Sequence, residues 1–196
     1  MMPLVLLAVA DGSEDIETVT LIDVLRRADI TVSVASVMSD VSVTLARGTR
    51  LVADKCLSAI DPESEFDAIV LPGGMPGAER LRDSEALTAL LKRQRRRDAW
   101  IAAICAAPGV ALAAHDLVRG YMVTGFPAFQ GSLVDAGGHL SQHPVVEDGR
   151  LLTSQGPATA MGFALHLVGL LVDEATERRI AEGLLAASQE SALQRH

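Results

Sequence analysis

The chain has 196 residues and a formal net charge of −8, from 17 basic and 25 acidic side chains. A chain of this length buries roughly 70% of its unfolded surface, so we expect one domain that needs no disulfide staples. The acidic balance excludes the basic face of a nucleic-acid binder, and the 49% hydrophobic content excludes an intrinsically disordered chain.

Short apolar runs rich in β-branched residues alternate with longer helical patterns along the chain. Residues 3–9 predict a first strand, residues 13–28 a helix that Ser13 caps, and residues 30–37 a second strand. The helix carries an apolar stripe at a spacing of three, formed by Ile16, Val19, Ile22 and Leu25.

The rest of the chain repeats this alternation. The expected elements are a pair of small edge strands (41–52), a strand (66–71), a helix (84–97) capped by Ser84, a strand (100–104), a helix (106–114), a hairpin (145–154), a helix with Pro157 at its start and a last helix (173–187). One domain is expected over residues 1–187, followed by a polar tail, residues 188–196, that frays.

This alternation predicts an α/β fold, a doubly wound sandwich with a mostly parallel central sheet and helices on both faces. In such folds the active site lies beyond the carboxyl ends of the strands. That rule directs attention to four turns, at residues 11–17, 72–77, 105–109 and 154–159.

Cys105 lies where an apolar strand passes directly into a helix through small residues. A sharp turn of this kind exposes a nucleophile, and a helix N-terminus lowers the pKa of a thiol. The alternative is a small buried core residue, because free cysteine is among the most buried residue types. The residues alone leave both interpretations open.

Two further turns carry groups that can assist a nucleophile. Glu17, if protonated, can donate a hydrogen bond to a thiolate, although it can also be an exposed first-turn acid of the kind expected for Glu14 and Asp15. The glycine-rich run 72–77 can direct backbone N–H groups at an oxyanion, although it can also be an ordinary tight turn.

The other side chains that could bind ligands or take part in catalysis are expected to have structural roles. The five histidines are expected on the surface or at an interface, although His139 follows two glycines and can also approach a pocket. The basic run 92–97 is expected to be a solvated helix end, and Cys56 to be structural. No cluster has metal-ligand spacing, and the apolar start meets Asp11 too soon for a signal peptide or membrane span.

Taken together, the four turns resemble the ThiJ/PfpI superfamily. The resemblance rests on the segments 14–18, 71–74, 102–108 and 153–157, in this order, and extends from about residue 3 to about residue 187. The branch nearest in pattern contains the parkinsonism-associated deglycase and bacterial YajL.

The resemblance implies a flavodoxin-like sandwich that is usually a homodimer. It implies that Cys105 is an oxidisable nucleophile and that Glu17 is its protonated hydrogen-bond donor. It also implies that the backbone N–H groups of Gly74 and Ala106 point towards an oxyanion or a sulfinate.

One position departs from the family's pattern. Where human-type members have a histidine before a proline, this chain has Phe126. A phenyl ring transfers no proton, so the Cys–His pair is incomplete and triad-type peptidase activity is not expected. The resemblance still implies that Phe126, Arg47 and Pro157 line the pocket wall, with Arg47 near the dimer boundary.

The resemblance implies two alternative functions for a cytoplasmic protein that uses no metal or organic cofactor. In the first, a stress-response enzyme of the glyoxalase III or protein deglycase type acts on methylglyoxal or glyoxal through Cys105 and Glu17. In the second, a redox-sensing chaperone has Cys105 oxidised to sulfinate, with little or no turnover. The expected partners are a small aldehyde or glycated adduct and a second copy of the chain, without nucleic acid or membrane.

Overall fold

The computed structural model describes residues 2–186 and 193–195. Its main sheet has the strand order β12-β10-β11-β7-β6-β1-β2-β5, and neighbours are parallel except in the β10–β11 hairpin. The strands are β1 (Leu4–Val9), β2 (Thr31–Ser36), β5 (Lys55–Cys56), β6 (Ala68–Leu71), β7 (Trp100–Ile104), β10 (Val145–Asp148), β11 (Leu151–Ser154) and β12 (Leu193–Arg195).

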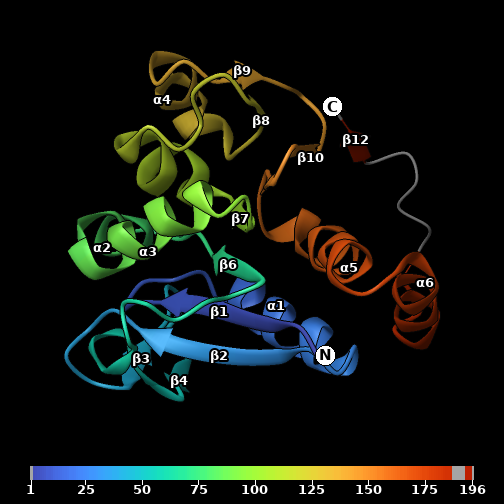
Figure 1. The fold of residues 1–196 in the computed structure, drawn as a ribbon, viewed down its shortest axis with the longest axis horizontal. Coiled ribbons are helices and arrows are strands. Elements are labelled where there is room, and N and C mark those ends of the chain that lie inside the picture. The colour runs from blue at the N-terminus through green and yellow to red at the C-terminus, as the bar shows by residue number, and fades with distance from the viewer. Residues whose placement is uncertain (1, 187–192, 196) are drawn as a thin grey trace.

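Helices cover both faces of this sheet (Figure 1). They are α1 (Asp15–Arg27), α2 (Gly77–Asp83), α3 (Glu85–Arg96), α4 (Gln130–Asp135), α5 (Ala160–Leu171) and α6 (Glu174–Gly183). Alternate side chains of β1 point to opposite faces: Val5 and Leu7 pack with α1 and α5, whereas Leu6 and Ala8 pack with α2 and α3. The predicted doubly wound α/β sandwich is therefore confirmed.

Two small sheets lie outside the main one. The predicted pair of edge strands is confirmed as the antiparallel hairpin of β3 (Ser42–Thr44) and β4 (Arg50–Val52). The parallel pair of β8 (Met122–Val123) and β9 (His139–Leu140) was not predicted, because strands of two residues show no periodicity.

The first helix differs from its sequence-based description in two ways. Its N-cap is Glu14, and the buried Ser13 instead accepts a hydrogen bond from the Ala10 N–H at 3.0 Å. The apolar stripe is buried only towards the end of the helix, since Ile16 and Val19 are 57% and 49% exposed. The start of α1 therefore presents an apolar surface outward.

Departures also occur after β7 and at the C-terminus. The helix expected over 106–114 includes a π-helix, Pro108–Leu112, in which the backbone is less tightly wound. The last helix, α6, ends at Gly183. Of the tail expected to fray, residues 188–192 and 196 lie outside the described residues, whereas 193–195 form β12 beside β10 (Figure 1).

Candidate active site

The strand β7 ends at Cys105, which lies on a sharp left-handed turn. Its φ of +65° is uncommon for a residue with a side chain, and the residue is 7% exposed. Two backbone hydrogen bonds hold the turn: the Cys105 N–H donates to the Ser154 carbonyl at 2.9 Å, and the Cys105 carbonyl accepts from the Phe126 N–H at 2.8 Å. Neighbouring segments therefore fix the position of the sulfur.

The carboxyl of Glu17 lies beside this sulfur although the two residues are 88 positions apart. Glu17 is fully buried in the first turn of α1, and its Oε2 accepts the Gly73 N–H at 2.7 Å. Its Oε1 is buried without a nitrogen or oxygen partner among the described residues. The Cys105 side chain is the remaining hydrogen-bonding neighbour of the carboxyl.

Burial raises the pKa of Glu17 from 4.5 to about 7. This value includes the hydrogen bonds with Gly73 and Cys105, which lower the pKa, and the nearby carboxylate of Glu14, which raises it. The carboxyl therefore keeps its proton over a pH range in which an exposed glutamate is ionised.

The environment of Cys105 does not meet the expectation of a lowered pKa. Burial, followed by the charge and hydrogen bond of an ionised Glu17, raises the pKa of the thiol to about 12. The negative charge of Glu17 raises the pKa of the thiol only while Glu17 is ionised. The N–H groups of Gly74 and Ala106, directed at the sulfur, lower the pKa of the thiol. The protonation state of Glu17 therefore decides how readily Cys105 ionises.

Both glycines of the turn after β6 are required by its geometry. A Cβ atom on Gly73 would lie 2.6 Å from the Cys105 Cβ and 2.8 Å from the Ala106 nitrogen, which is too close for any side chain. Gly74 has a φ of +86°, in the left-handed region that favours glycine. These features allow the loop to approach the sulfur and direct an N–H group at it.

The three predicted wall residues lie in the loops that follow β3, β8 and β11. The exposed Arg47 lies in the β3–β4 loop, where its backbone N–H donates to Asp15 Oδ2 at 2.7 Å. Phe126 is bonded through its backbone to Cys105, and its ring lies against the residue that precedes Pro157.

One of the two expectations about nearby acids is wrong. Glu14 is buried, with 9% of its surface exposed, whereas an exposed side chain was expected. Its carboxylate caps α1 by accepting the Glu17 N–H at 2.8 Å. Asp15 accepts the N–H groups of Arg47 and Thr49, at 2.7 and 3.3 Å, so its carboxylate joins α1 to the β3–β4 loop.

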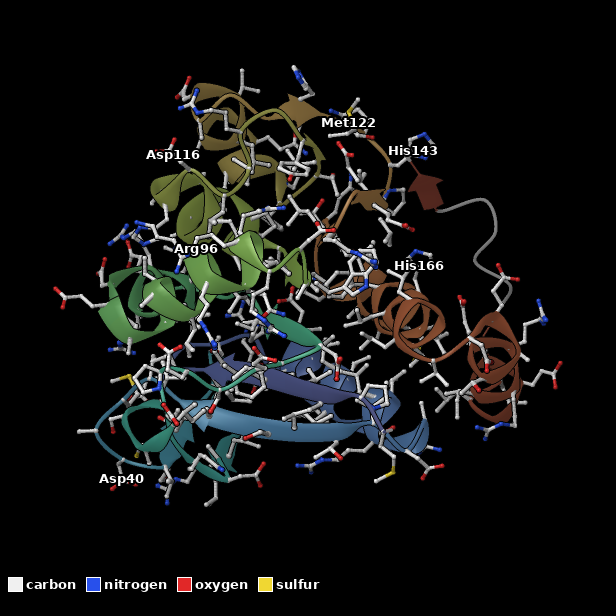
Figure 2. All side chains as sticks on the ribbon, in the orientation of Figure 1. Asp40, Arg96, Asp116, Met122, His143 and His166 are labelled. Atoms are coloured by element: carbon white, nitrogen blue, oxygen red, sulfur yellow. The ribbon has the colours of Figure 1, made fainter. Side chains whose placement is uncertain are left out.

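One histidine also departs from expectation. His166 is 6% exposed, on α5 near β10 (Figure 2), and its Nε2 is hydrogen-bonded to Glu147 Oε2 at 2.7 Å. His139 and His143 are exposed, as expected. The basic run at the end of α3 agrees with the expected solvated helix end, since Arg93 pairs with Glu63 and Glu65, and Arg96 is exposed (Figure 2).

Sequence reasoning missed two groups in this region. The structural role of Gly73 follows from its approach to Cys105, which no local pattern reveals. The hydroxyl of Thr124 is buried without a hydrogen-bond partner among the described residues, two positions before Phe126. A single buried threonine carries no sequence signal that separates it from an ordinary core residue.

Within residues 2–186 and 193–195, no group of three or more His, Cys, Asp or Glu side chains is placed to hold a metal ion. No helix in the same ranges is long and apolar enough to cross a membrane.

Comparison with known proteins identifies relatives of the same architecture. The family model described as DJ-1/PfpI matches residues 4–170. The Arabidopsis thaliana protein DJ-1 homolog B is 43% identical over 85% of this chain, which spans only 37% of that relative and 46% of its homolog A. A Caenorhabditis elegans relative named glutathione-independent glyoxalase DJR-1.2 is 36% identical, covering 82% of this chain and 84% of that protein.

The structure of oxidised Toxoplasma gondii DJ-1 superposes with a TM-score of 0.91, at 42% identity, over 95% of this chain and all of that one. Fold and site together define an α/β sandwich with a cysteine on a strand-to-helix turn beside a buried glutamate. The chain belongs to the DJ-1/PfpI family. The finer likeness to YajL stays a prediction.

Proposed function

We propose that this chain is a cysteine-dependent enzyme of the oxidative and carbonyl stress response, of the glyoxalase III or protein deglycase type. One observation carries the proposal: the Cys105 side chain meets the buried carboxyl of Glu17 and the N–H groups of Gly74 and Ala106. The name of the C. elegans relative, a glutathione-independent glyoxalase, supports the same chemistry.

The first step is addition of the Cys105 thiolate to the aldehyde carbon of methylglyoxal or glyoxal. The carbon–sulfur bond forms, the carbonyl electron pair moves to oxygen, and Glu17 donates its proton to that oxygen to give a hemithioacetal. The N–H groups of Gly74 and Ala106 stabilise the developing negative charge.

Glu17 then acts as a base. It removes the hydrogen from the former aldehyde carbon and returns this proton to the neighbouring carbonyl oxygen, which gives an enediol. The hydroxyl proton on the sulfur-bearing carbon then moves to the neighbouring carbon, which gives a thioester of the 2-hydroxy acid. Water hydrolyses the thioester and restores the cysteine. The net change is an internal redox rearrangement plus hydrolysis, from methylglyoxal to lactate, and it requires no external oxidant or cofactor. A carboxyl with a pKa of about 7 is suited to both donating and accepting this proton.

The direct test is conversion of methylglyoxal to lactate without glutathione. We expect turnover by the native protein and by Cys56→Ser, which alters the other free cysteine, but none by Cys105→Ser. Glu17→Gln is expected to reduce kcat by about 10²–10⁴-fold, as is typical for loss of a general acid–base group. Equal rates for the native protein and Cys105→Ser would reject the proposal.

The alternative function is a redox-sensing chaperone in which Cys105 becomes a sulfinate. The solved Toxoplasma relative is described as oxidised, which supports oxidation chemistry within the family. Mild peroxide followed by mass spectrometry separates the alternatives. Two added oxygens confined to Cys105, together with absent aldehyde turnover, would favour the sensor.

We further propose a single domain over residues 1–187 and a homodimer in the cytoplasm. The two free cysteines support a reducing compartment. Exposed apolar side chains support the dimer: Ile16 and Val19 on α1, and Val52 on β4, are 57%, 49% and 71% exposed. The start of α1 and the β3–β4 hairpin are hydrogen-bonded to each other, through the Ala46 N–H and the Ser13 carbonyl at 2.8 Å.

A further inference from the structure

Phe126 is an exposed aromatic side chain fixed next to the candidate nucleophile. It is 40% exposed, whereas Phe66 and Phe163 are 6% and 0% exposed. Single exposed apolar residues are common on protein surfaces and need no functional explanation. Phe126 differs because its backbone N–H donates to the Cys105 carbonyl at 2.8 Å, which ties it to the turn that presents the sulfur.

The ring of Phe126 has Phe129 on one side and the loop after β11 on another. Its centroid lies 6.3 Å from that of Phe129, at an interplanar angle of 45°, which is a favourable tilted arrangement for two aromatic rings. Phe129 packs against the core cluster formed with α1 and α5. On another side, the ring atom Cδ2 lies 3.5 Å from the position of a Cβ on Gly156, in the loop after β11.

The surroundings of the ring determine what it can bind. A phenyl ring offers apolar surface and no hydrogen-bond donor. The nearby amide of Gln130 is engaged, since its Nε2 donates to the Gly125 carbonyl at 3.1 Å. The groups that act on the sulfur are polar: the Glu17 carboxyl and the N–H groups of Gly74 and Ala106. Phe126, bonded through its backbone to Cys105, therefore adds apolar surface next to a nucleophile that has polar neighbours.

We propose that Phe126, supported by Phe129, binds the hydrocarbon substituent of a 2-oxoaldehyde while Cys105 attacks its aldehyde carbon. This inference rests on the proposed function and names its substrate class: 2-oxoaldehydes with an apolar or aromatic substituent, in preference to unsubstituted glyoxal. Burial of the substituent against the ring provides the selectivity.

The test compares kcat/KM for phenylglyoxal and glyoxal. The native protein is expected to prefer phenylglyoxal, and Phe126→Ala is expected to reduce that preference about tenfold, at the lower end of what one apolar contact contributes to specificity. Phe126→Leu, which keeps an apolar side chain, should lose less. Val134→Ala is the matched control: Val134 is an apolar residue on α4, 52% exposed, and should leave the preference unchanged. An unchanged preference in Phe126→Ala would overturn the inference.

A second readout does not require turnover. Cys105 in a Cys56→Ser background is alkylated with N-phenylmaleimide and N-methylmaleimide, and the ratio of the two rates is measured. We expect Phe126→Ala to lower this ratio, and an equal ratio in both proteins would contradict an apolar subsite. Absence of aldehyde turnover by the native protein, combined with a lowered maleimide ratio, would reject the proposed function and retain the subsite.

Discussion

At the scale of single residues, the site depends on which group of the Cys105–Glu17 pair holds a shared proton. A thiolate at Cys105 can receive hydrogen bonds from Gly74, Ala106 and a protonated Glu17. A carboxylate at Glu17 receives one strong hydrogen bond, from Gly73, and leaves the buried Oε1 with only the thiol, a weak donor. These donors therefore stabilise a charge on Cys105 as long as Glu17 keeps its proton.

The raised pKa of Glu17 makes stability depend on pH. The unfolded chain loses this proton near pH 4.5, whereas the folded protein keeps it to about pH 7. The folded state therefore binds the extra proton in this window, so this carboxyl lowers the free energy of unfolding as the pH rises from 4.5 to about 7. The expected loss is about 3 kcal/mol.

Denaturant titrations of the native protein and Glu17→Gln across this pH window measure the effect. Glu17→Gln should lack this component of the pH dependence, because an amide does not titrate. Parallel stability curves for the two proteins would show that Glu17 does not keep its proton when folded.

The approach of Gly73 to Cys105 gives a second prediction. Gly73→Ala places a methyl group 2.6 Å from the Cys105 Cβ and 2.8 Å from a backbone nitrogen, so the turn must move. We expect a loss of about 1–3 kcal/mol in the free energy of unfolding, together with altered alkylation of Cys105. Gly131→Ala, on α4 with open space around it, is the control and should keep native stability and native alkylation. Native behaviour of Gly73→Ala would refute the close contact.

At the scale of elements, the start of α1 and the β3–β4 hairpin form one unit through the Asp15 carboxylate. Asp15→Ala removes the acceptor of the Arg47 and Thr49 N–H groups, at 2.7 and 3.3 Å. We expect faster hydrogen exchange at these two amides and a loss of about 1 kcal/mol, typical of a hydrogen bond. Asp23→Ala, which removes only a surface pair with Arg27, should leave both exchange rates unchanged. Equal rates in all three proteins would contradict the link.

Elements with a strong pattern could be predicted from the sequence, and weakly patterned ones could not. The strand 100–104 and the hairpin at 145–154 have continuous apolar runs or a clear turn, and both were predicted closely. The π-helix after Cys105 was missed because its residues carry no pattern that separates a π-helix from an α-helix. The cap at Glu14 was displaced by one residue because Ser13 bonds back to the Ala10 N–H.

The candidate site also has features that the sequence predicted and features that it did not. Cys105, Glu17 and the glycine loop were located because the carboxyl ends of parallel strands gather at one edge of a sheet. The burial of Glu14 and the raised pKa of Cys105 were not foreseen, because both depend on side-chain packing between segments far apart in the sequence.

At the scale of the whole molecule, the strand order brings the four turns together at the carboxyl ends of the parallel strands. The apolar side chains at the start of α1 remain exposed. Ile16→Lys together with Val19→Lys is expected to shift the proposed dimer to monomer in sedimentation or light scattering, because buried unpaired charges oppose association. Val134→Lys, at another exposed apolar position, should keep the dimer. A native protein that is monomeric at every concentration would contradict the proposal directly.

The most direct test is to measure the pKa of Cys105 in the native sequence and in Glu17→Gln. Both proteins carry Cys56→Ser, and ionisation is monitored by thiolate absorbance as the pH is raised. If Glu17 keeps its proton while the thiol ionises, both proteins have a neutral donor beside the sulfur. We therefore predict two pKa values within about one unit of each other, both below the value of about 12 that the thiol has beside an ionised Glu17. A native pKa near 12, with a much lower one in Glu17→Gln, would contradict it.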